Sequence, residues 1–303
     1  MRKSAGDRST GVHFRWIALL ACALLAAACS SIKLGYNNAD TLLVYALDNY
    51  FDLDEAQASL ARERVRALQA WHREKELPGY SLLLQDAQTR LTGGAAVTAD
   101  DVLAFQRGMN ERLARLGDES APDLAALALT LTPAQLERFA DKLARDNSKA
   151  RRELLQIAGR ETPADREKRY VERVEQWFGS VSAEQREIIR ADIGARPPAR
   201  DWWMDERERR QRELTAVLQR IQAEQPAREV ATVWLKEYFA QLVEPRDAGR
   251  LVKLQQFRVT NAALIAQLIS AATPRQKSTL VKKLRGYAED FAALANGGLK
   301  NRG

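Results

Sequence analysis

The sequence predicts an all-α fold, an irregular multi-helix bundle of about 10–12 helices. Apolar residues recur at steps of three or four, as at Leu280, Leu284 and Tyr287, and such steps place them on one face of a helix. No segment shows the sustained alternation with period two that a half-buried strand requires. Short capping motifs mark where many of these helices start.

Six segments have the pattern of a capping box, in which a Ser, Thr or Asp caps a free N–H and a polar residue three positions later reaches back. The boxes are Asp54–Gln57, Thr132–Gln135, Ser182–Gln185 and Thr273–Gln276, which end in Gln, and Thr98–Asp101 and Thr162–Asp165, which end in Asp. Pro133, Pro163 and Pro274 lie just inside three starts, where a missing N–H costs no hydrogen bond. The Gln boxes are separated by 78, 50 and 91 residues, so they do not form a repeat of fixed period.

These starts and the apolar stripes between them define the predicted helices. We expect a break at Pro78, because a proline inside a helix removes one backbone hydrogen bond and clashes with the preceding turn. A boundary near residues 159–162 would divide the bundle into two lobes, 38–160 and 161–303, and 194–198 is the alternative boundary. The predicted helices cover residues 38–50, 54–76, 79–91, 98–117, 122–130, 132–158, 163–179, 182–193, 199–223, 226–243, 246–271 and 273–295.

Residues 1–28 have the pattern of a secretory signal peptide. The start is basic, an apolar run extends from Trp16 to Ala28, and small residues precede the expected cleavage site. The run of 13 residues is shorter than the ~20 that a membrane-spanning helix needs. We therefore expect export and removal of this segment rather than a membrane span.

The residue after this segment is Cys29, preceded by Leu25-Ala26-Ala27-Ala28, and this order resembles the lipobox of bacterial lipoproteins. The resemblance implies that Cys29 carries diacylglycerol, that 29–37 form a short tether and that 38–303 form the helical domain. Ser31 stands where an Asp would resemble an inner-membrane retention signal, so we expect the periplasmic face of an outer membrane. An ordinary signal peptide that leaves Cys29 as a free thiol is the alternative.

The charge balance argues against a nucleic-acid partner. Removal of the four basic residues and one acid of 1–28 lowers the formal charge from +7 to +4. The remaining charges are interleaved, as in the run from Asp205 to Glu213, which is typical of a solvated helix surface. The mature chain keeps only Cys29, so we expect no disulfide and no thiolate metal site.

The only histidine after the signal peptide is His72, and Glu76 follows it at the spacing of one helical turn. Together with Trp71, Arg73 and Tyr80 these residues form a candidate functional cluster. An imidazole beside a carboxylate is half of a general acid–base pair, but the chain carries no recognised nucleophile, phosphate-loop or zinc-protease motif. We therefore predict no catalytic residue, metal or cofactor, and favour a packing unit at a helix end.

A basic face is the second candidate site. Its residues recur at steps of three and four on two successive predicted helices, and they are Lys142, Arg145, Lys149, Arg152, Arg166, Arg169 and Arg173. Such a face attracts anionic headgroups near a membrane, and peptidoglycan or an envelope protein is another partner. An ordinary solvated face is the favoured interpretation.

Two asparagines, Asn147 and Asn261, interrupt apolar stripes. A buried amide needs hydrogen-bond partners. We expect each to satisfy the open end of a neighbouring helix, and a polar cleft is the alternative.

Several segments together resemble a family of uncharacterised bacterial lipoproteins with a domain of unknown function. They are Gly35-Tyr36-Asn37-Asn38, Tyr50-Phe51-Asp52-Leu53-Asp54-Glu55-Ala56-Gln57, Trp71-His72-Arg73, Glu76-Leu77-Pro78-Gly79-Tyr80 and Leu131-Thr132-Pro133-Ala134-Gln135. The resemblance implies the lipid anchor and the helical fold, and it implies no activity or substrate.

The sequence therefore favours a non-enzymatic envelope lipoprotein that binds or scaffolds another component. One alternative is an enzyme acting on glycan or lipid, with His72 and Glu76 in a cleft. Another is a periplasmic chaperone, which would need a large apolar cradle.

Overall fold

A computed structural model describes residues 32–196 and 199–300. The predicted signal peptide and Cys29 lie outside these residues. The chain divides into two units, Met1–Ala39 and Asp40–Gly303. In the first unit, residues 32–37, which belong to the expected tether 29–37, are helical, and a turn follows at Asn38.

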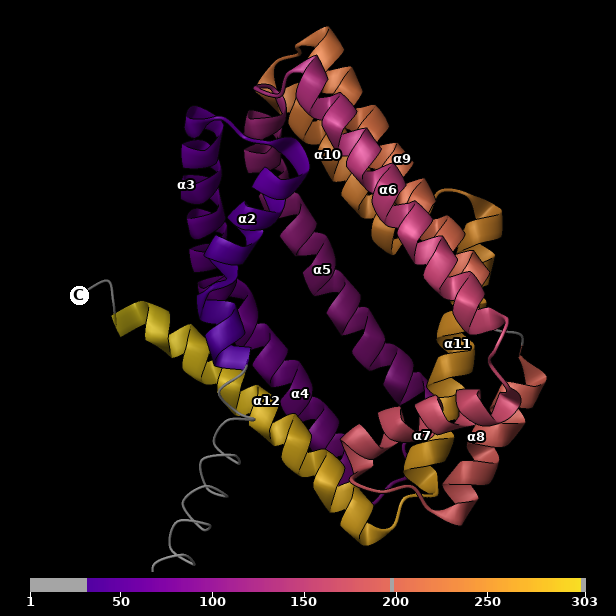
Figure 1. Cartoon of the computed structure of the whole chain (residues 1–303). Helices are drawn as coiled ribbons and strands as arrows, with labels where there is room; N and C mark the ends of the chain where they lie inside the picture. Colours follow the sequence, from indigo (N-terminus) through magenta and orange to yellow (C-terminus); the bar gives the residue numbers. More distant parts are fainter. Residues whose placement is uncertain (1–31, 197–198, 301–303) are drawn as a thin grey trace, which may run out of the picture. The chain divides into compact units, whose positions relative to one another are not determined.

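The described residues form eleven α-helices and one π-helix, with no strand among them, so the all-α prediction is confirmed (Figure 1). The helices are α2 (Ala39–Phe51), α3 (Glu55–Trp71), the π-helix η1 (His72–Glu76), α4 (Leu77–Thr92), α5 (Ala99–Ala128), α6 (Pro133–Ala158), α7 (Pro163–Phe178), α8 (Ala183–Ala195), α9 (Arg200–Glu224), α10 (Arg228–Val243), α11 (Ala248–Ser270) and α12 (Pro274–Lys300).

The predicted break at Pro78 is wrong, because the chain stays helical from α3 through η1 into α4. A proline cannot donate a backbone hydrogen bond and its ring crowds the preceding turn. Directly before Pro78 the backbone widens, and the N–H of Leu77 donates to the carbonyl of His72, five residues back. The π-helical turn therefore lets the helix continue past the proline.

The predicted separation of helices 98–117 and 122–130 is also wrong. Both segments belong to α5, which contains Pro122 in its interior. Ala121 and Ala125 are completely buried, and a Cβ at Gly117 would lie 2.8 Å from Cβ of Phe239 in α10. Close packing of α5 against α10 along this stretch offsets the one hydrogen bond that Pro122 cannot make.

All six predicted capping boxes are present. Five show the side chain of the cap accepting from the N3 backbone and the N3 side chain accepting from the cap backbone. At the start of α12, Oγ1 of Thr273 accepts from the N–H of Gln276, and Oε1 of Gln276 accepts from the N–H of Thr273. These motifs satisfy N–H groups that every helix start leaves open.

The four Gln boxes meet in two pairs, which their spacing in the sequence does not reveal. Gln57 Nε2 donates to the carbonyl of Thr130 at 2.8 Å, and Gln135 Nε2 donates to the carbonyl of Asp52 at 3.0 Å. The two side chains also bond each other, with Gln135 Nε2 2.6 Å from Gln57 Oε1. The starts of α3 and α6 are thereby joined, although they lie 78 residues apart.

The second pair repeats this arrangement. Gln185 Nε2 donates to the carbonyl of Leu268 at 2.9 Å, and Gln276 Nε2 donates to that of Ser180 at 2.8 Å. Gln276 Nε2 also lies 2.8 Å from Gln185 Oε1. The starts of α8 and α12 are joined in this way.

The helix that precedes each pair ends in the same manner. Asp52 follows Phe51 at the end of α2 with φ 55°, and Gly179 follows Phe178 at the end of α7 with φ 78°. Each left-handed residue donates its N–H to the carbonyl four residues back, at 2.7 Å. This reverses the chain directly after a buried Phe in both places.

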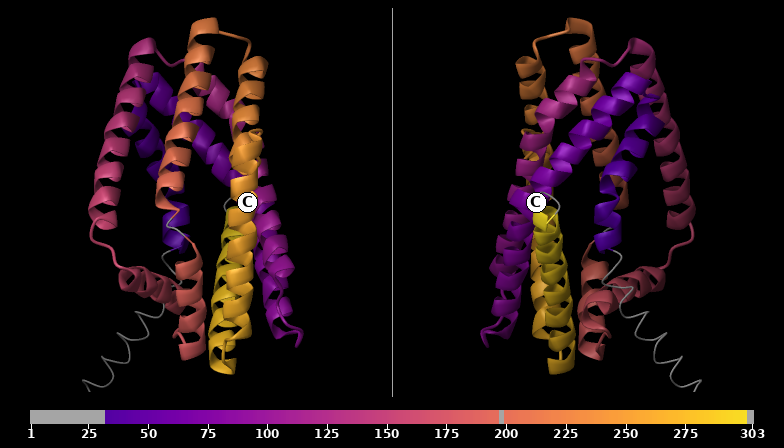
Figure 2. Two further views of the ribbon diagram at one scale, coloured as in Figure 1. Left: turned by 90° about the vertical axis from the view of Figure 1, so that its right-hand side faces the viewer. Right: turned by 90° about the vertical axis from the view of Figure 1, so that its left-hand side faces the viewer.

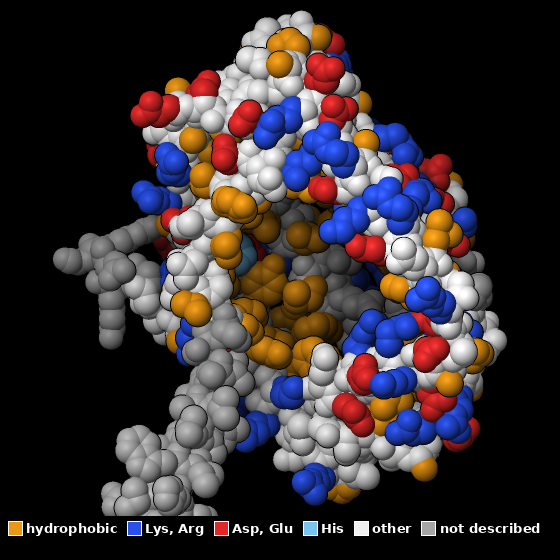
Figure 3. All heavy atoms as spheres, viewed as in Figure 1, with side chains coloured by type: hydrophobic (Ala, Val, Ile, Leu, Met, Phe, Trp, Pro, Cys, Tyr) orange, Lys and Arg blue, Asp and Glu red, His pale blue; other side chains and the backbone are white. Residues whose placement is uncertain are grey.

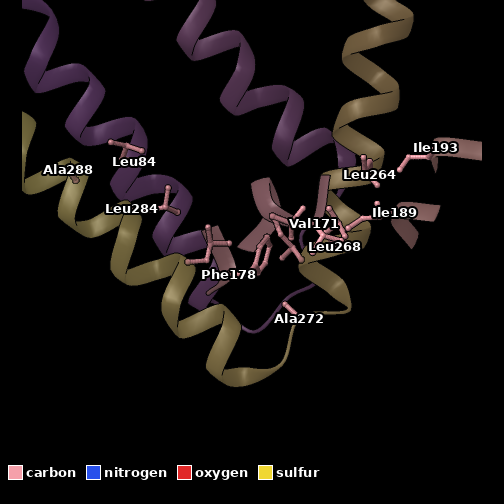
Figure 4. Packing of buried hydrophobic residues seen from close by; sticks show 13 residues of the cluster. Leu84, Val171, Phe178, Ile189, Ile193, Leu264, Leu268, Ala272, Leu284 and Ala288 are labelled. Carbon is pink, nitrogen blue, oxygen red and sulfur yellow. The ribbon is translucent and has the colours of Figure 1, made fainter. Parts of the chain in front are cut away.

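Two hydrophobic cores lie within Asp40–Gly303, and each draws residues from both sides of residue 160. One combines Leu84 of α4 with residues of α7, α8, α11 and α12, and Figure 4 shows these side chains pointing toward one another. The other combines Phe51 of α2 with residues of α5, α6, α9 and α10. Helices α4 and α12 lie side by side (Figures 1 and 2).

Replacing Gln185 with Ala tests the glutamine pairs, and Asp165→Ala is the matched control, since both remove the N3 side chain of a capping box. Gln185 is fully buried, so its loss removes the partner of the Leu268 carbonyl and of the Ser182 N–H, at about 1–3 kcal/mol for each buried group. We expect a loss of about 2–4 kcal/mol in urea unfolding for Gln185→Ala, against about 1 kcal/mol for the exposed Asp165. Equal losses would contradict a structural role for the pair.

Candidate functional site

The candidate cluster lies where α3 passes through η1 into α4, and its centre is the carboxylate of Glu76. This side chain is 3% exposed. Arg115 of α5 donates two parallel hydrogen bonds to it, from Nε at 2.7 Å and from Nη2 at 3.1 Å. Arg112 Nη1 lies 3.7 Å from Glu76 Oε2. Bidentate pairs of this kind are charge-assisted and specific in geometry, so α5 holds Glu76 in place and neutralises it.

Gly79 makes room for the second arginine. A Cβ at this position would lie 2.5 Å from Arg112 Nη1. Instead, Arg112 Nη2 donates to the carbonyl of Gly79 at 2.7 Å, and its guanidinium carbon lies 5.4 Å from the centre of the Tyr80 ring. Directly after the π-helical turn, Gly79 thus allows Arg112 to approach the backbone, and Tyr80 provides the ring over which Arg112 lies.

His72 is embedded among aromatic rings. Its ring centre lies 5.8 Å from that of Tyr80 and 6.4 Å from that of Trp71, and Tyr80 lies 5.9 Å from Phe291 of α12. Burial lowers the pKa of His72 below its ordinary value, and the charge of Glu76 opposes this shift. Burial raises the pKa of Tyr80, and Glu76 adds to that increase. Both side chains are therefore mainly neutral at pH 7.

The same stretch is bonded to α12. Arg73 Nη1 donates to the carbonyl of Leu294 at 3.2 Å, and Ser81 Oγ donates to the carbonyl of Ala288 at 2.9 Å. From Arg73 to Ser81 the partner residue moves back from Leu294 to Ala288, so α12 runs antiparallel to η1 and α4. The cluster is therefore a joint at which α3, α4, α5 and α12 meet.

The structure brings together all five residues of the predicted cluster, Trp71, His72, Arg73, Glu76 and Tyr80. It adds four that sequence reasoning missed, namely Arg112 and Arg115 of α5 and Phe291 and Leu294 of α12. The spacing of three between Arg112 and Arg115 indicates a shared helix face. No sequence pattern indicates that this face meets Glu76, because the residues lie 36–39 positions apart.

The geometry limits the chemistry of this site. Both oxygens of Glu76 accept hydrogen bonds from Arg115, so this carboxylate is paired with α5. Among the residues that the structure describes, no group of three His, Cys, Asp or Glu could hold a metal ion.

The predicted basic residues make local contacts on two helices. Lys142 Nζ lies 5.2 Å from the ring of Tyr50, and Arg173 lies 5.6 Å from that of Tyr170. Arg152 Nη1 donates to Ser148 Oγ at 2.7 Å, and Arg169 pairs with Glu161. The other members of this predicted face are Arg145 and Lys149, which are exposed, and Arg166, which is half-buried.

The two asparagines bond residues of neighbouring elements. Asn147 Nδ2 of α6 donates to Gln211 Oε1 of α9 at 2.6 Å. Asn261 Oδ1 of α11 accepts from Arg196, the residue after α8, at 3.4 Å. Gln211 lies inside α9, so Asn147 does not satisfy an open helix end as expected, whereas Asn261 contacts the residue that directly follows α8.

A second buried glutamate was not recognised in the sequence. Glu206 is 6% exposed and accepts hydrogen bonds of 2.7–3.1 Å from Arg209, Arg210 and Arg250. Burial opposes its ionisation, but these arginines outweigh that effect and hold the pKa of Glu206 well below its usual range. Glu206 lies in the run from Asp205 to Glu213, which the sequence predicted to be solvated. Its hydrogen bonds with Arg250 of α11 show that it joins α9 to α11.

The surface combines mixed charges with a hydrophobic hollow. Figure 3 shows Lys and Arg interleaved with Asp and Glu on the viewed face, and hydrophobic side chains gathered in a hollow. Among the described residues, no helix is both long and apolar enough to cross a membrane.

The fold and the joint define an all-helical protein in which short polar motifs connect distant helices. The chain belongs to DUF6279, a family of unknown function whose sequence pattern matches residues 49–238, more than half of the chain. The matched segment contains the Gln57–Gln135 pair and the whole Trp71–Tyr80 stretch. No curated protein and no solved structure matches the chain.

Glu76→Gln should destabilise the protein by about 2–4 kcal/mol. Removing one partner of a buried ion pair costs about 3–5 kcal/mol, and the partly exposed Arg115 regains some solvation. Urea unfolding of the variant measures the loss. Glu111→Gln, an exposed change on α5, is the control and should remain within about 0.5 kcal/mol of the parent. A similarly small effect for Glu76→Gln would contradict the joint.

The buried His72 predicts a pH dependence of stability. Because burial lowers the folded pKa of His72, the unfolded chain binds a proton there at higher pH than the folded chain does. The stability that the neutral, buried His72 contributes is therefore present above the unfolded pKa and is lost as the pH falls from the unfolded pKa through the folded pKa. We expect the free energy of unfolding to fall more between about pH 7.5 and pH 5 in the parent than in His72→Gln. Urea titrations at each pH measure this difference, and parallel curves would refute it.

Proposed function

We propose that the chain is a lipid-anchored envelope protein whose helical domain binds or scaffolds another envelope component at the periplasmic face of the outer membrane. The anchor is taken from the sequence of residues 25–29. The observation that carries the non-enzymatic role is the bidentate pairing of Glu76 with Arg115. This pairing supports a structural role for Glu76, which lies one helical turn after His72 in the sequence.

The surface supports a binding role. A hollow lined by hydrophobic side chains lies on the face seen in Figure 3, and concave apolar surfaces commonly bind ligands or partners. Exposed apolar side chains also occur on α10 and α11, as at Val233 and Val259. Such positions give a partner apolar contacts between charged residues that fix its orientation.

The enzyme alternative has less support. It requires His72 and Glu76 to act as a pair in a cleft, whereas Glu76 is held by α5 and the ring of His72 lies among Trp71 and Tyr80. The hollow is an observation that favours a second candidate, a periplasmic chaperone that holds unfolded clients. A scaffold would bind one folded partner, whereas a chaperone would bind many unfolded proteins.

The test is a crosslinking pulldown of the full-length protein from intact cells, with His72→Ala and Cys29→Ala run beside it. We expect one folded envelope partner, recovered equally with the parent and with His72→Ala and lost with Cys29→Ala. His72→Ala serves as the matched control, because it removes the only histidine of the domain and leaves the anchor unchanged.

Two outcomes would overturn this expectation. If no partner is found and His72→Ala at normal protein levels reproduces the deletion phenotype, the enzyme alternative is favoured. A broad set of unrelated, unfolded periplasmic proteins would favour the chaperone.

A further inference from the structure

Helix α2 buries only one of its sides. Val44 and Phe51 are buried, and Leu47 packs against the same core. Asp40 lies on this side and is bonded to Arg66 of α3 at 3.3 Å. The side of α2 that faces the protein is therefore fixed by both apolar and polar contacts.

The opposite side of α2 is exposed and uncharged, and it is apolar except for Asn49. Leu42 is 59% exposed and Tyr45 is 69% exposed, and Ala46 and Asn49 continue the same face at helical spacing. Leu43 flanks this face and is also exposed. A surface helix normally carries charged or polar residues opposite its core side, and 29% of this chain is charged. This face is thus suited to an apolar environment.

The position of α2 in the chain indicates which apolar environment covers it. Nine residues separate Cys29 from Ala39, so the helix begins within ~30 Å of the anchor even if that segment is fully extended. The helical residues 32–37 shorten this reach further. A tyrosine next to leucines is typical of a helix that lies at the headgroup level of a bilayer.

We propose that the outward face of α2, formed by Leu42, Tyr45 and Ala46 with Leu43 at its edge, lies on the bilayer that holds the lipid of Cys29. The proposal rests on the anchor assumed in the proposed function. The acyl chains attach the protein, and α2 sets which side of its helical domain is turned to the membrane.

The test uses the full-length acylated protein in vesicles of phosphatidylethanolamine and phosphatidylglycerol. Because Cys29 is acylated and Cys22 is removed with the signal peptide, Leu42→Cys supplies the single free thiol for a fluorescent label. The matched control is Val233→Cys on α10, a position with a similar exposure of 53%. Quenchers are placed on the lipid acyl chains or, as iodide, in the water.

We expect lipid-borne quenchers to reduce the fluorescence of the Leu42 label several-fold more than that of the Val233 label, and iodide to do the reverse. Equal access of both labels to iodide would overturn the proposal, because α2 would then face water. Protection of the Leu42 label from both quenchers would also overturn it, since a protein partner or a second copy would then cover α2.

Failure of the anchor is measured separately. The mass of the amino-terminal peptide shows whether Cys29 carries diacylglycerol. An unmodified cysteine would refute the proposed anchor, and the quenching experiment on Cys29→Ser with vesicles added would then test α2 alone. Lipid-borne quenching in that variant would support the membrane face without the anchor, and its absence would overturn both.

Discussion

Each helix starts with N–H groups that have no partner inside the helix. Residues 38–303 contain no cysteine, so no disulfide joins these helices. A glutamine at the third position of a capping box answers both needs. Its oxygen accepts from the cap backbone, and its amide nitrogen remains free to donate. When the helix start is buried, that nitrogen must find an acceptor, and here it finds a carbonyl and a second capping glutamine. Two such pairs therefore fix which helix starts meet.

The stretch from Trp71 to Tyr80 applies the same constraint to charge. A buried carboxylate needs a paired cation, and Arg115 supplies it from α5. Because desolvation offsets much of the attraction, such a pair adds little net stability, yet losing one partner is costly. The pair consequently selects one arrangement of α3, α4 and α5 against others. Glu206, with its three arginines, links α9 to α11 in the same way.

This use of polar groups has a consequence for function. The residues that would suggest catalysis, His72 and Glu76, are committed to packing and to an ion pair. The hollow of Figure 3 is the surface proposed for a partner, and the outward side of α2 is the surface proposed for the membrane. The proposed binding role and the proposed membrane contact both arise from surfaces that the core does not use.

The sequence by itself determined the helical class, the six capping boxes and the residues of the Trp71–Tyr80 cluster. Caps and apolar stripes depend on residues three or four apart, so they can be read locally. The difference between Gln and Asp at the third box position was also visible, and it separates the boxes that pair from those that do not.

Only the tertiary structure decided which helix starts pair, that Arg115 binds Glu76, and that the helix continues past Pro78 and Pro122. Packing against α10 holds α5 together across Pro122, and a π-helical turn carries the chain past Pro78. Each of these outcomes depends on groups far apart in the chain, or on a backbone adjustment that the surrounding helices support. Local residue spacing carries no information about such contacts.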